Sequence, residues 1–272
     1  MRFKPLALML LFVAMGHGVG LAQTVEEEKK AVKEYVPPPE ILADTQELAA
    51  ATNTIIELTN KFREAQGLPP VTTQPQLAAA AEYFADFMAT AYKYGHSADG
   101  KKPAERAKKY GYDYCIVSEN IAYQFSSVGF SPEEVAEKFE TGWENSPDHR
   151  KNMLDADVTD MGVAVFQSQQ TGYYFAVQMF GRPKSLAIEF TMFNRTGKLL
   201  VYESRDRRMS LPPDYNRVHY LCRPTEIKLL NVIEAEPEKT EVLAKFKPAA
   251  KSIYTITSSH GKLVVSVQEQ KP

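Results

Sequence analysis

Residues 146–154 read SPDHRKNML, and the fold can be worked out from this stretch. Serine followed by proline is typical of a helix start, because the Ser146 hydroxyl can accept a hydrogen bond from a free amide and proline fits the first turn. The spacing predicts a short helix through Leu154 with His149 in its first turn. Free amides give that turn a partial positive charge, so we expect a lowered pKa and a neutral ring for His149.

Four further helices are predicted upstream, one of them a short, weakly amphipathic helix over residues 103–110. Residues 131–134 read SPEE, in which Ser131 can cap a helix that runs to about Trp143, while the last glutamate bonds back to the cap amide. Apolar residues also recur at helical spacing after Asp44 and again over residues 75–92. These amphipathic helices are expected to form the core of an N-terminal domain.

Downstream, apolar residues recur at every second position rather than at helical spacing. From Gly162 the alternation predicts a β-hairpin that turns at residues 169–172 and ends near Pro183. Helices followed by antiparallel strands predict an α+β domain over residues 44–183.

The remaining residues, 186–269, predict a small all-β domain. Short alternating runs are separated by turn signals, and they indicate one hairpin over residues 186–202 and a similar one over residues 253–267. The predicted fold class is therefore α+β, followed by a small β-rich domain.

Residues 1–22 have the pattern of a secretory signal peptide. Arg2 and Lys4 precede an apolar run at residues 6–15, and small residues end at Ala22. The run is shorter than the ~18 residues that a membrane span needs, so we expect cleavage and a secreted or periplasmic protein that is not an integral membrane protein. Residues 23–43 are rich in charge and proline and predict an exposed linker.

The composition of the chain argues against several classes of function and site. The 272 residues include 32 Lys and Arg against 34 Asp and Glu, a formal net charge of −2, so no polybasic footprint points to nucleic acid. Two cysteines, Cys115 and Cys222, exclude a disulfide-rich scaffold and a zinc site built from thiolates. They are either a pair or two free thiols, and export favours a disulfide that joins the two predicted domains.

Four histidines lie beyond the predicted signal peptide. His219 and His260 fall in the β region, and we interpret both as surface residues. His96 and His149 lie at polar junctions between loops and helices, with Glu119 between them in the sequence. On residue types alone, each of these three is more often solvated than part of a site.

Four motifs occur in a fixed order and change this interpretation. They are GHS at residues 95–97, SENIA at residues 118–122, Trp143 followed by SPDHRKNML, and MGVA at residues 161–164. In this order they resemble the CAP superfamily, which contains the cysteine-rich secretory, antigen 5 and pathogenesis-related 1 proteins, and they are similar to its bacterial secreted branch. The resemblance implies an α-β-α sandwich with a cleft on which two histidines and two acidic residues converge.

By motif position, the resemblance implies that His96, Glu119 and His149 are three of these four residues. Ser146 stands about where the fourth, a glutamate in eukaryotic members, would lie, and Glu140 and Glu144 are nearby.

Two neutral imidazoles and a carboxylate are suitable ligands for zinc or another divalent metal, and they leave a coordination position open. The sequence holds neither a zinc-protease nor a serine-hydrolase motif. The leading hypothesis is a binding module for a small apolar or amphipathic ligand, a peptide or an envelope component. The alternatives are a metal-dependent or Glu/His acid-base hydrolase acting on peptides or cell-wall material, and a purely structural hydrogen-bond network.

Overall fold

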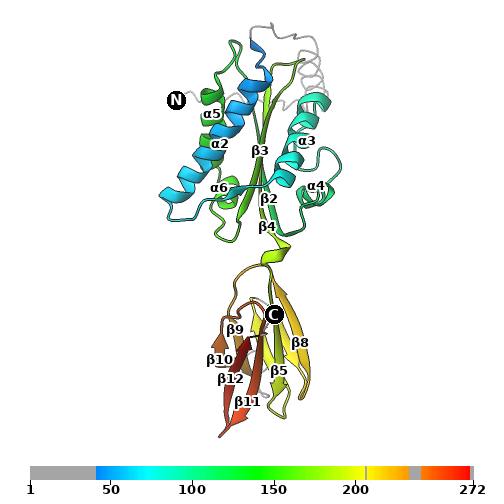
Figure 1. Ribbon diagram of the computed structural model, residues 1–272, viewed down its shortest axis with the longest axis vertical. Helices are drawn as coiled ribbons and strands as arrows, with labels where there is room; N and C mark the ends of the chain where they lie inside the picture. Colours follow the sequence, from blue (N-terminus) through cyan, green and yellow to red (C-terminus); the bar gives the residue numbers. More distant parts are fainter. Residues whose placement is uncertain (1–40, 206, 233–239, 270–272) are drawn as a thin grey trace, which may run out of the picture.

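The computed structural model describes residues 41–205, 207–232 and 240–269. The chain forms two lobes joined by a narrow junction, one with helices and one built of strands (Figure 1). The predicted signal peptide and all but the last three residues of the predicted linker lie outside the described residues. Within the described ranges, no helix is long and apolar enough to cross a membrane.

In the N-terminal lobe, helices cover both faces of a four-stranded sheet (Figure 1). The strand order is β1-β3-β4-β2, with bounds Thr72–Thr73 (β1), Tyr114–Gln124 (β2), Asp160–Gln167 (β3) and Tyr174–Pro183 (β4). One face carries α2 (Thr45–Ala65), α5 (Pro132–Glu144) and α6 (Pro147–Met153), and the other carries α3 (Pro75–Ala91) and α4 (Pro103–Lys109). This arrangement confirms the predicted α+β class.

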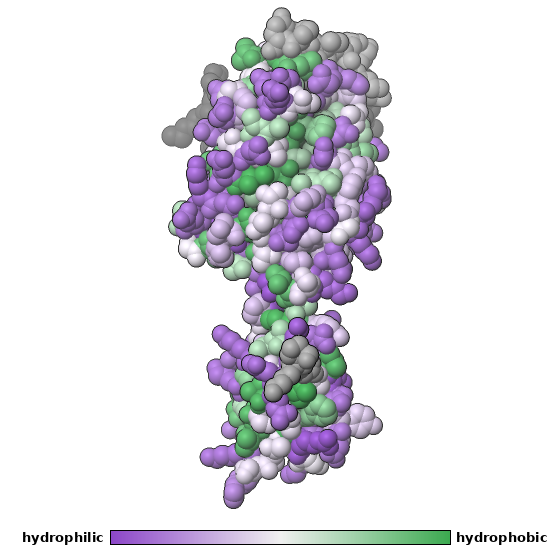
Figure 2. All heavy atoms as spheres, viewed as in Figure 1, coloured by the Kyte–Doolittle hydropathy of each residue, from purple (hydrophilic) through white to green (hydrophobic). Residues whose placement is uncertain are grey.

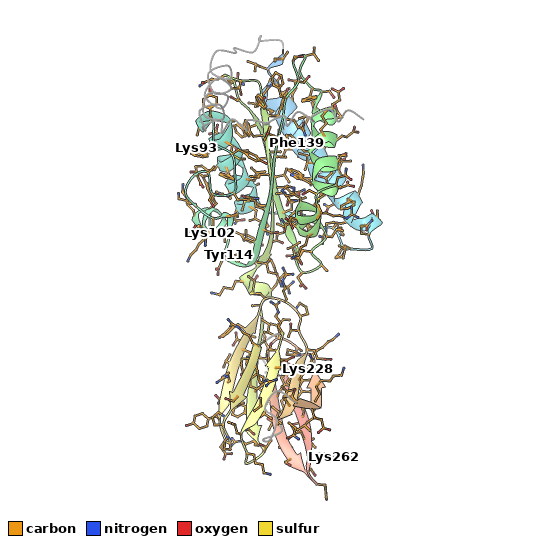
Figure 3. All side chains as sticks on the ribbon, turned by 180° about the vertical axis from the view of Figure 1, so that it is seen from behind. Lys93, Lys102, Tyr114, Phe139, Lys228 and Lys262 are labelled. Atoms are coloured by element: carbon orange, nitrogen blue, oxygen red, sulfur yellow. A yellow bond between two sulfur atoms is a disulfide. The ribbon has the colours of Figure 1, made fainter. Side chains whose placement is uncertain are left out.

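The sheet separates two apolar cores. Alternation along β4 sends Phe180 to the core under α2 and α5, and Val177 to the core under α3. Phe139 of α5 lies in the first core, where Figure 3 shows it beside the sheet. Gly162 of β3 allows the close packing of α3, because a Cβ atom there would lie 2.2 Å from the backbone carbon of Leu77.

Residues 41–43, the end of the predicted linker, are packed on this lobe rather than exposed. Ile41 is 6% exposed, and its carbonyl oxygen accepts a 2.9 Å hydrogen bond from Nε2 of Gln167. The amide of Ala43 donates to Oε1 of the same glutamine. The buried Gln167 side chain therefore holds residues 41–43 against the end of β3.

The C-terminal lobe consists of two four-stranded sheets packed face to face (Figure 1). The strand orders are β10-β9-β6-β7 and β12-β11-β5-β8. The bounds are Ile188–Arg195 (β5), Leu200–Ser204 (β6), Arg207–Leu211 (β7), Asn216–Leu221 (β8), Ile227–Val232 (β9), Thr240–Phe246 (β10), Ser252–Ser259 (β11) and Lys262–Glu269 (β12). The β11–β12 pair confirms the hairpin predicted at residues 253–267.

The hairpin predicted at residues 186–202 is wrong. Strands β5 and β6 belong to different sheets, so the turn between them is a corner of the sandwich. The buried Asn194 side chain holds this corner by donating to the carbonyl oxygens of Lys198 and Leu211. Local alternation indicates strands, but it does not specify which strands pair.

The interpretation of His219 as a surface residue is also wrong. Alternation along β8 turns its ring inward, where it is 8% exposed and stacks on Phe190 with ring centroids 4.9 Å apart. Its Nε2 lies 3.1 Å from the hydroxyl of Tyr202. Burial lowers the pKa of His219, and the charge of Arg217 lowers it further. His260 lies in an exposed turn, as predicted.

A disulfide between Cys115 and Cys222 joins the two lobes, and their Cα atoms lie 5.1 Å apart. Next to this bond, Arg223 forms ion pairs with Asp155 and Asp157 of the N-terminal lobe. Figure 3 places Tyr114, the neighbour of Cys115, at this junction. On the face drawn in Figure 2, apolar side chains are visible at the narrow junction and on both lobes, and hydrophilic side chains are spread over both lobes.

Candidate functional site

Strand β2 carries Glu119 at the edge of the N-terminal sheet. No strand is predicted from the sequence for this segment, whereas it is an 11-residue strand paired with β4. Glu119 is 4% exposed and lies on the face of α3 and α4. Its neighbour Asn120 points to the opposite face, where it meets Gln178.

Arg106 of α4 neutralises Glu119. Its Nη2 lies 2.9 Å from Oε1 and 2.7 Å from Oε2 of the carboxylate, and its Nη1 lies 2.8 Å from Oδ1 of Asp99. The guanidinium also lies 3.5 Å from the ring centroid of Phe84. One arginine thus compensates two buried carboxylates, and no local pattern in the sequence predicts it.

His96 reaches the same carboxylate from the loop after α3. Its Nδ1 lies 2.9 Å from Oε1 of Glu119. A carboxylate only accepts hydrogen bonds, so Nδ1 carries the proton and, in the neutral ring, Nε2 keeps its lone pair. The His96 side chain is 49% exposed, which leaves room for a ligand at Nε2.

His149 occupies the third position of α6, as the sequence predicts. The expected hydrogen bond from a helix amide to the Ser146 hydroxyl is absent, although Ser146 is the N-cap residue. The pKa of His149 is lowered as the sequence predicts, but the cause differs from the expected charge of the helix amides. Burial is the main cause and the charge of His96 adds to it, while Asp148 acts in the opposite direction. The influence of His96 indicates that the two imidazoles lie near each other.

Two asparagines fix α6 against the edge of β2. Nδ2 of Asn120 donates to the carbonyl oxygen of His149 over 3.2 Å, and Nδ2 of Asn152 donates to the carbonyl oxygen of Glu119 over 3.3 Å. Asn152 also donates to Oδ1 of Asn120. Both belong to the motifs quoted above, but the sequence does not reveal that they position His149 relative to Glu119.

Glu140 is buried on the α2 and α5 face of the sheet, opposite to Glu119, and its hydrogen bond is to Thr59 rather than to a histidine. It is 2% exposed, and its Oε2 lies 3.3 Å from Oγ1 of Thr59. Thr59 accepts from Nε2 of Gln178, whose Oε1 accepts from Asn120. A chain of hydrogen bonds therefore links Glu140 to the residues that position His149.

The environment of Glu140 favours its neutral form. Burial, together with the charge of Glu144, raises its pKa to about 8, against a hydrogen bond from Thr59 that lowers it. That bond is weak, because the single Thr59 proton has a shorter contact, 2.8 Å, with the carbonyl oxygen of Ile55. Glu144 is partly exposed and acts on Glu140 through its charge.

The contacts of the histidines and glutamates determine which side chains could bind a metal ion. In the described residues, no group of three His, Cys, Asp or Glu side chains is arranged to hold an ion. Both oxygens of Glu119 are already bound to Arg106. The donor set that fits a divalent ion is therefore the pair of imidazoles, with Glu119 as the carboxylate that orients His96, a common arrangement around zinc.

Two cavities lie away from the histidines. One of about 420 Å³ is lined by Ile41, Val128, Phe130 and Tyr174 among others. Another of about 430 Å³ lies at the junction between the lobes, beside the disulfide.

Residues 56–180 match the family described as the cysteine-rich secretory protein family, CAP. The N-terminal domain belongs to the CAP superfamily. Over 136 residues the chain is 31% identical to the uncharacterized protein YkwD of Bacillus subtilis, which covers 50% of this chain and 49% of YkwD. The chain thus spans about half the length of this curated relative.

Two solved structures are also similar over about half of the chain. An extracellular protein of Bacillus anthracis that contains an SCP domain is 26% identical, with a TM-score of 0.43, over 52% of this chain and 44% of that one. An outer surface protein of Borrelia burgdorferi is 19% identical, with a TM-score of 0.45, over 53% of this chain and 98% of that one.

Proposed function

We propose that the CAP domain is an exported ligand-binding module in which His96 and His149 hold a divalent metal ion such as zinc. The observation that carries this proposal is the 2.9 Å contact between Nδ1 of His96 and Glu119, which directs the Nε2 lone pair away from the carboxylate. The lowered pKa of His149 keeps its ring neutral, as a metal ligand must be.

The metal, when bound, would supply a Lewis acid for a polar group of the ligand. Residues of the protein itself hold the two histidines in position. Arg106 and Glu119 fix the orientation of His96, while Asn120 and Asn152 fix the backbone around His149. The ligand class expected from the sequence is a small apolar or amphipathic molecule, a peptide or an envelope component.

Binding is favoured over hydrolysis by the state of Glu119. If both imidazoles hold the metal, the base that takes a proton from water in a hydrolase would have to be a carboxylate. Both oxygens of Glu119 are bound to Arg106, and Glu140 is buried against Thr59, so neither carboxylate is free to act as that base. We therefore place the hydrolase hypothesis second.

Action outside the cytoplasm is part of the proposal. The predicted signal peptide supports it, and so does the disulfide between Cys115 and Cys222, because such bonds persist in oxidising compartments. Sequencing the N-terminus of protein recovered from the exported fraction tests this part, with a first residue near Gln23 expected. Met1 retained on membrane-bound protein would contradict it.

Zinc titration by calorimetry tests the metal site. His96→Ala and His149→Ala should each weaken zinc binding at least about tenfold, and Glu119→Gln should weaken it about 10-fold to 100-fold through the lost orientation of His96. His260→Ala is the matched control, since this histidine is exposed in the other domain. Equal zinc affinity in wild type and both histidine variants, or no zinc binding by wild type, would leave a structural network as the better account.

A further inference from the structure

Four aromatic side chains extend from the histidine site along the sheet; we call them the aromatic row, made of Tyr94, Tyr123, Tyr173 and Phe175. Tyr123 lies on the same face of β2 as Glu119, four residues along, or about 13 Å at the rise of a strand. The hydroxyl of Tyr94 donates to the carbonyl oxygen of Ile121, midway between them. The row therefore begins beside His96 and continues away from it.

The rings of the row contact one another. Tyr94 and Tyr123 meet edge to face with centroids 5.0 Å apart, and Tyr123 lies 5.9 Å from Tyr173 and 6.3 Å from Phe175. Tyr94 and Tyr123 are each 49% exposed. Contiguous exposed rings of this kind mark an interaction surface. Because the rings already pack against one another, ordering them on ligand binding would cost little side-chain entropy.

The row carries no charge. Burial raises the pKa of Tyr94, so its hydroxyl stays protonated, and the neighbouring carboxylate Glu119 is compensated by Arg106. A surface for single-stranded nucleic acid pairs its stacking rings with cations for the phosphates. Within the described residues, the Lys and Arg side chains that stack on rings do so on other aromatic residues and not on the row, so a neutral ligand fits the row better.

An extended peptide is disfavoured by the contacts of the β2 edge. A peptide that adds a strand to a sheet needs free carbonyl and amide groups along the edge. On β2 the carbonyl oxygen of Glu119 accepts from Asn152 and that of Ile121 accepts from Tyr94. Side chains thus occupy the positions that the peptide backbone would use.

We infer that the aromatic row binds a neutral glycan chain, which makes an envelope polysaccharide the ligand class of the histidine site; this inference rests on the proposed binding function. The apolar face of a pyranose ring stacks on tyrosine and phenylalanine, and its hydroxyl groups bond to polar tips such as the tyrosine hydroxyls. The glycan would lie over Tyr123 with one end at His96.

Chitohexaose, a neutral chain of six N-acetylglucosamine units, is the probe for this inference. It is titrated by calorimetry into the full oxidised protein, with and without zinc. We expect binding by wild type and a loss of at least about tenfold in Tyr123→Ala, as for a ring that stacks on its ligand. Tyr123→Phe, which keeps the ring, should stay within about threefold of wild type. Tyr215→Ala is the matched control, because this tyrosine is 63% exposed in the β domain.

Zinc titration of the same variants separates this inference from the proposed function. Tyr123→Ala should keep the wild-type zinc affinity, whereas His149→Ala should lose it. Zinc binding without chitohexaose binding would overturn the glycan inference and leave the metal site standing. Equal chitohexaose affinity in Tyr123→Ala and wild type would also overturn it. So would binding of a thymidine oligomer or of phosphatidylcholine vesicles through Tyr123 in place of the glycan.

Discussion

Arg106 and Glu119 form an ion pair in which Nη2 lies 2.7 Å from Oε2 and neither side chain exposes any surface. Breaking such a pair leaves an uncompensated charge in the interior, which typically costs about 3 to 5 kcal/mol. Arg106→Met should therefore lower the free energy of unfolding by that amount, and adding Glu119→Gln and Asp99→Asn should restore part of it. Urea unfolding followed by Trp143 fluorescence measures this, since Trp143 is the one tryptophan of the chain.

The control for this experiment is Arg195→Met. Arg195 pairs with Asp214 at the surface, with both side chains more than half exposed. Exposed pairs contribute about 0 to 1 kcal/mol. A loss in Arg106→Met no larger than in Arg195→Met would contradict the assignment of a buried pair.

Glu140 should make the CAP domain less stable as the pH rises. Its folded pKa of about 8 lies above its ordinary value of 4.5, so between these values the folded state binds more protons than the unfolded state. Stability is then full below pH 4.5 and falls by up to about 1.4 kcal/mol per pH unit towards pH 8. Glu140→Gln, which mimics the neutral carboxyl, should remove this slope. Parallel pH curves for wild type and variant, read from Trp143 fluorescence, would refute the prediction.

His219 should give the β domain the opposite dependence. Burial lowers its folded pKa below 6.5, so the unfolded state binds more protons and stability is lost as the pH falls below that value. His219→Gln should unfold with a flatter pH profile between pH 7 and 5, while the exposed His260→Gln should behave like wild type. Hydrogen exchange of the β8 amides reports on this domain alone, and an unchanged slope in His219→Gln would rule the histidine out as the cause.

The disulfide should contribute strongly to stability. Its two cysteines are 107 residues apart, and the loop-entropy model gives about 4.7 kcal/mol for a loop of this order, as an upper figure. The double variant Cys115→Ser and Cys222→Ser should unfold at lower denaturant concentration than the oxidised wild type. Reduced wild type should match the double variant, and a reductant should leave that variant unchanged. Equal stability of the oxidised protein and the variant would show that the bond adds nothing.

Local signals account for what could be predicted from the sequence. The capping box at Ser131 and the helical spacing after Asp44 identify α5 and α2, because these signals act within a few residues. The order of the motifs identifies His96, Glu119 and His149, and the structure places Glu119 in contact with His96, with His149 close enough to interact electrostatically with His96.

Distant contacts account for what could not be predicted. Glu119 is buried because Arg106, 13 residues away, compensates it, and nothing in the sequence around either residue shows this contact. Glu140 lies nine residues before His149 in the sequence, yet α5 directs its side chain to Thr59 in the core. The predicted pairing of β5 with β6 is wrong for the same reason, because contacts throughout the domain determine which strands pair.

The bond between Cys115 and Cys222 also fixes how mechanical tension would travel through the molecule. A pull between residues 41 and 269 runs along the backbone to Cys115, crosses the sulfur atoms and leaves from Cys222. Residues 116–221 form a closed covalent loop that bears none of this load. Glu119 and His149 lie in the unloaded loop, whereas His96 lies in the loaded segment. Stretching the chain would therefore strain the histidine site from one side, and reduction of the bond would place all three residues in the path of the force.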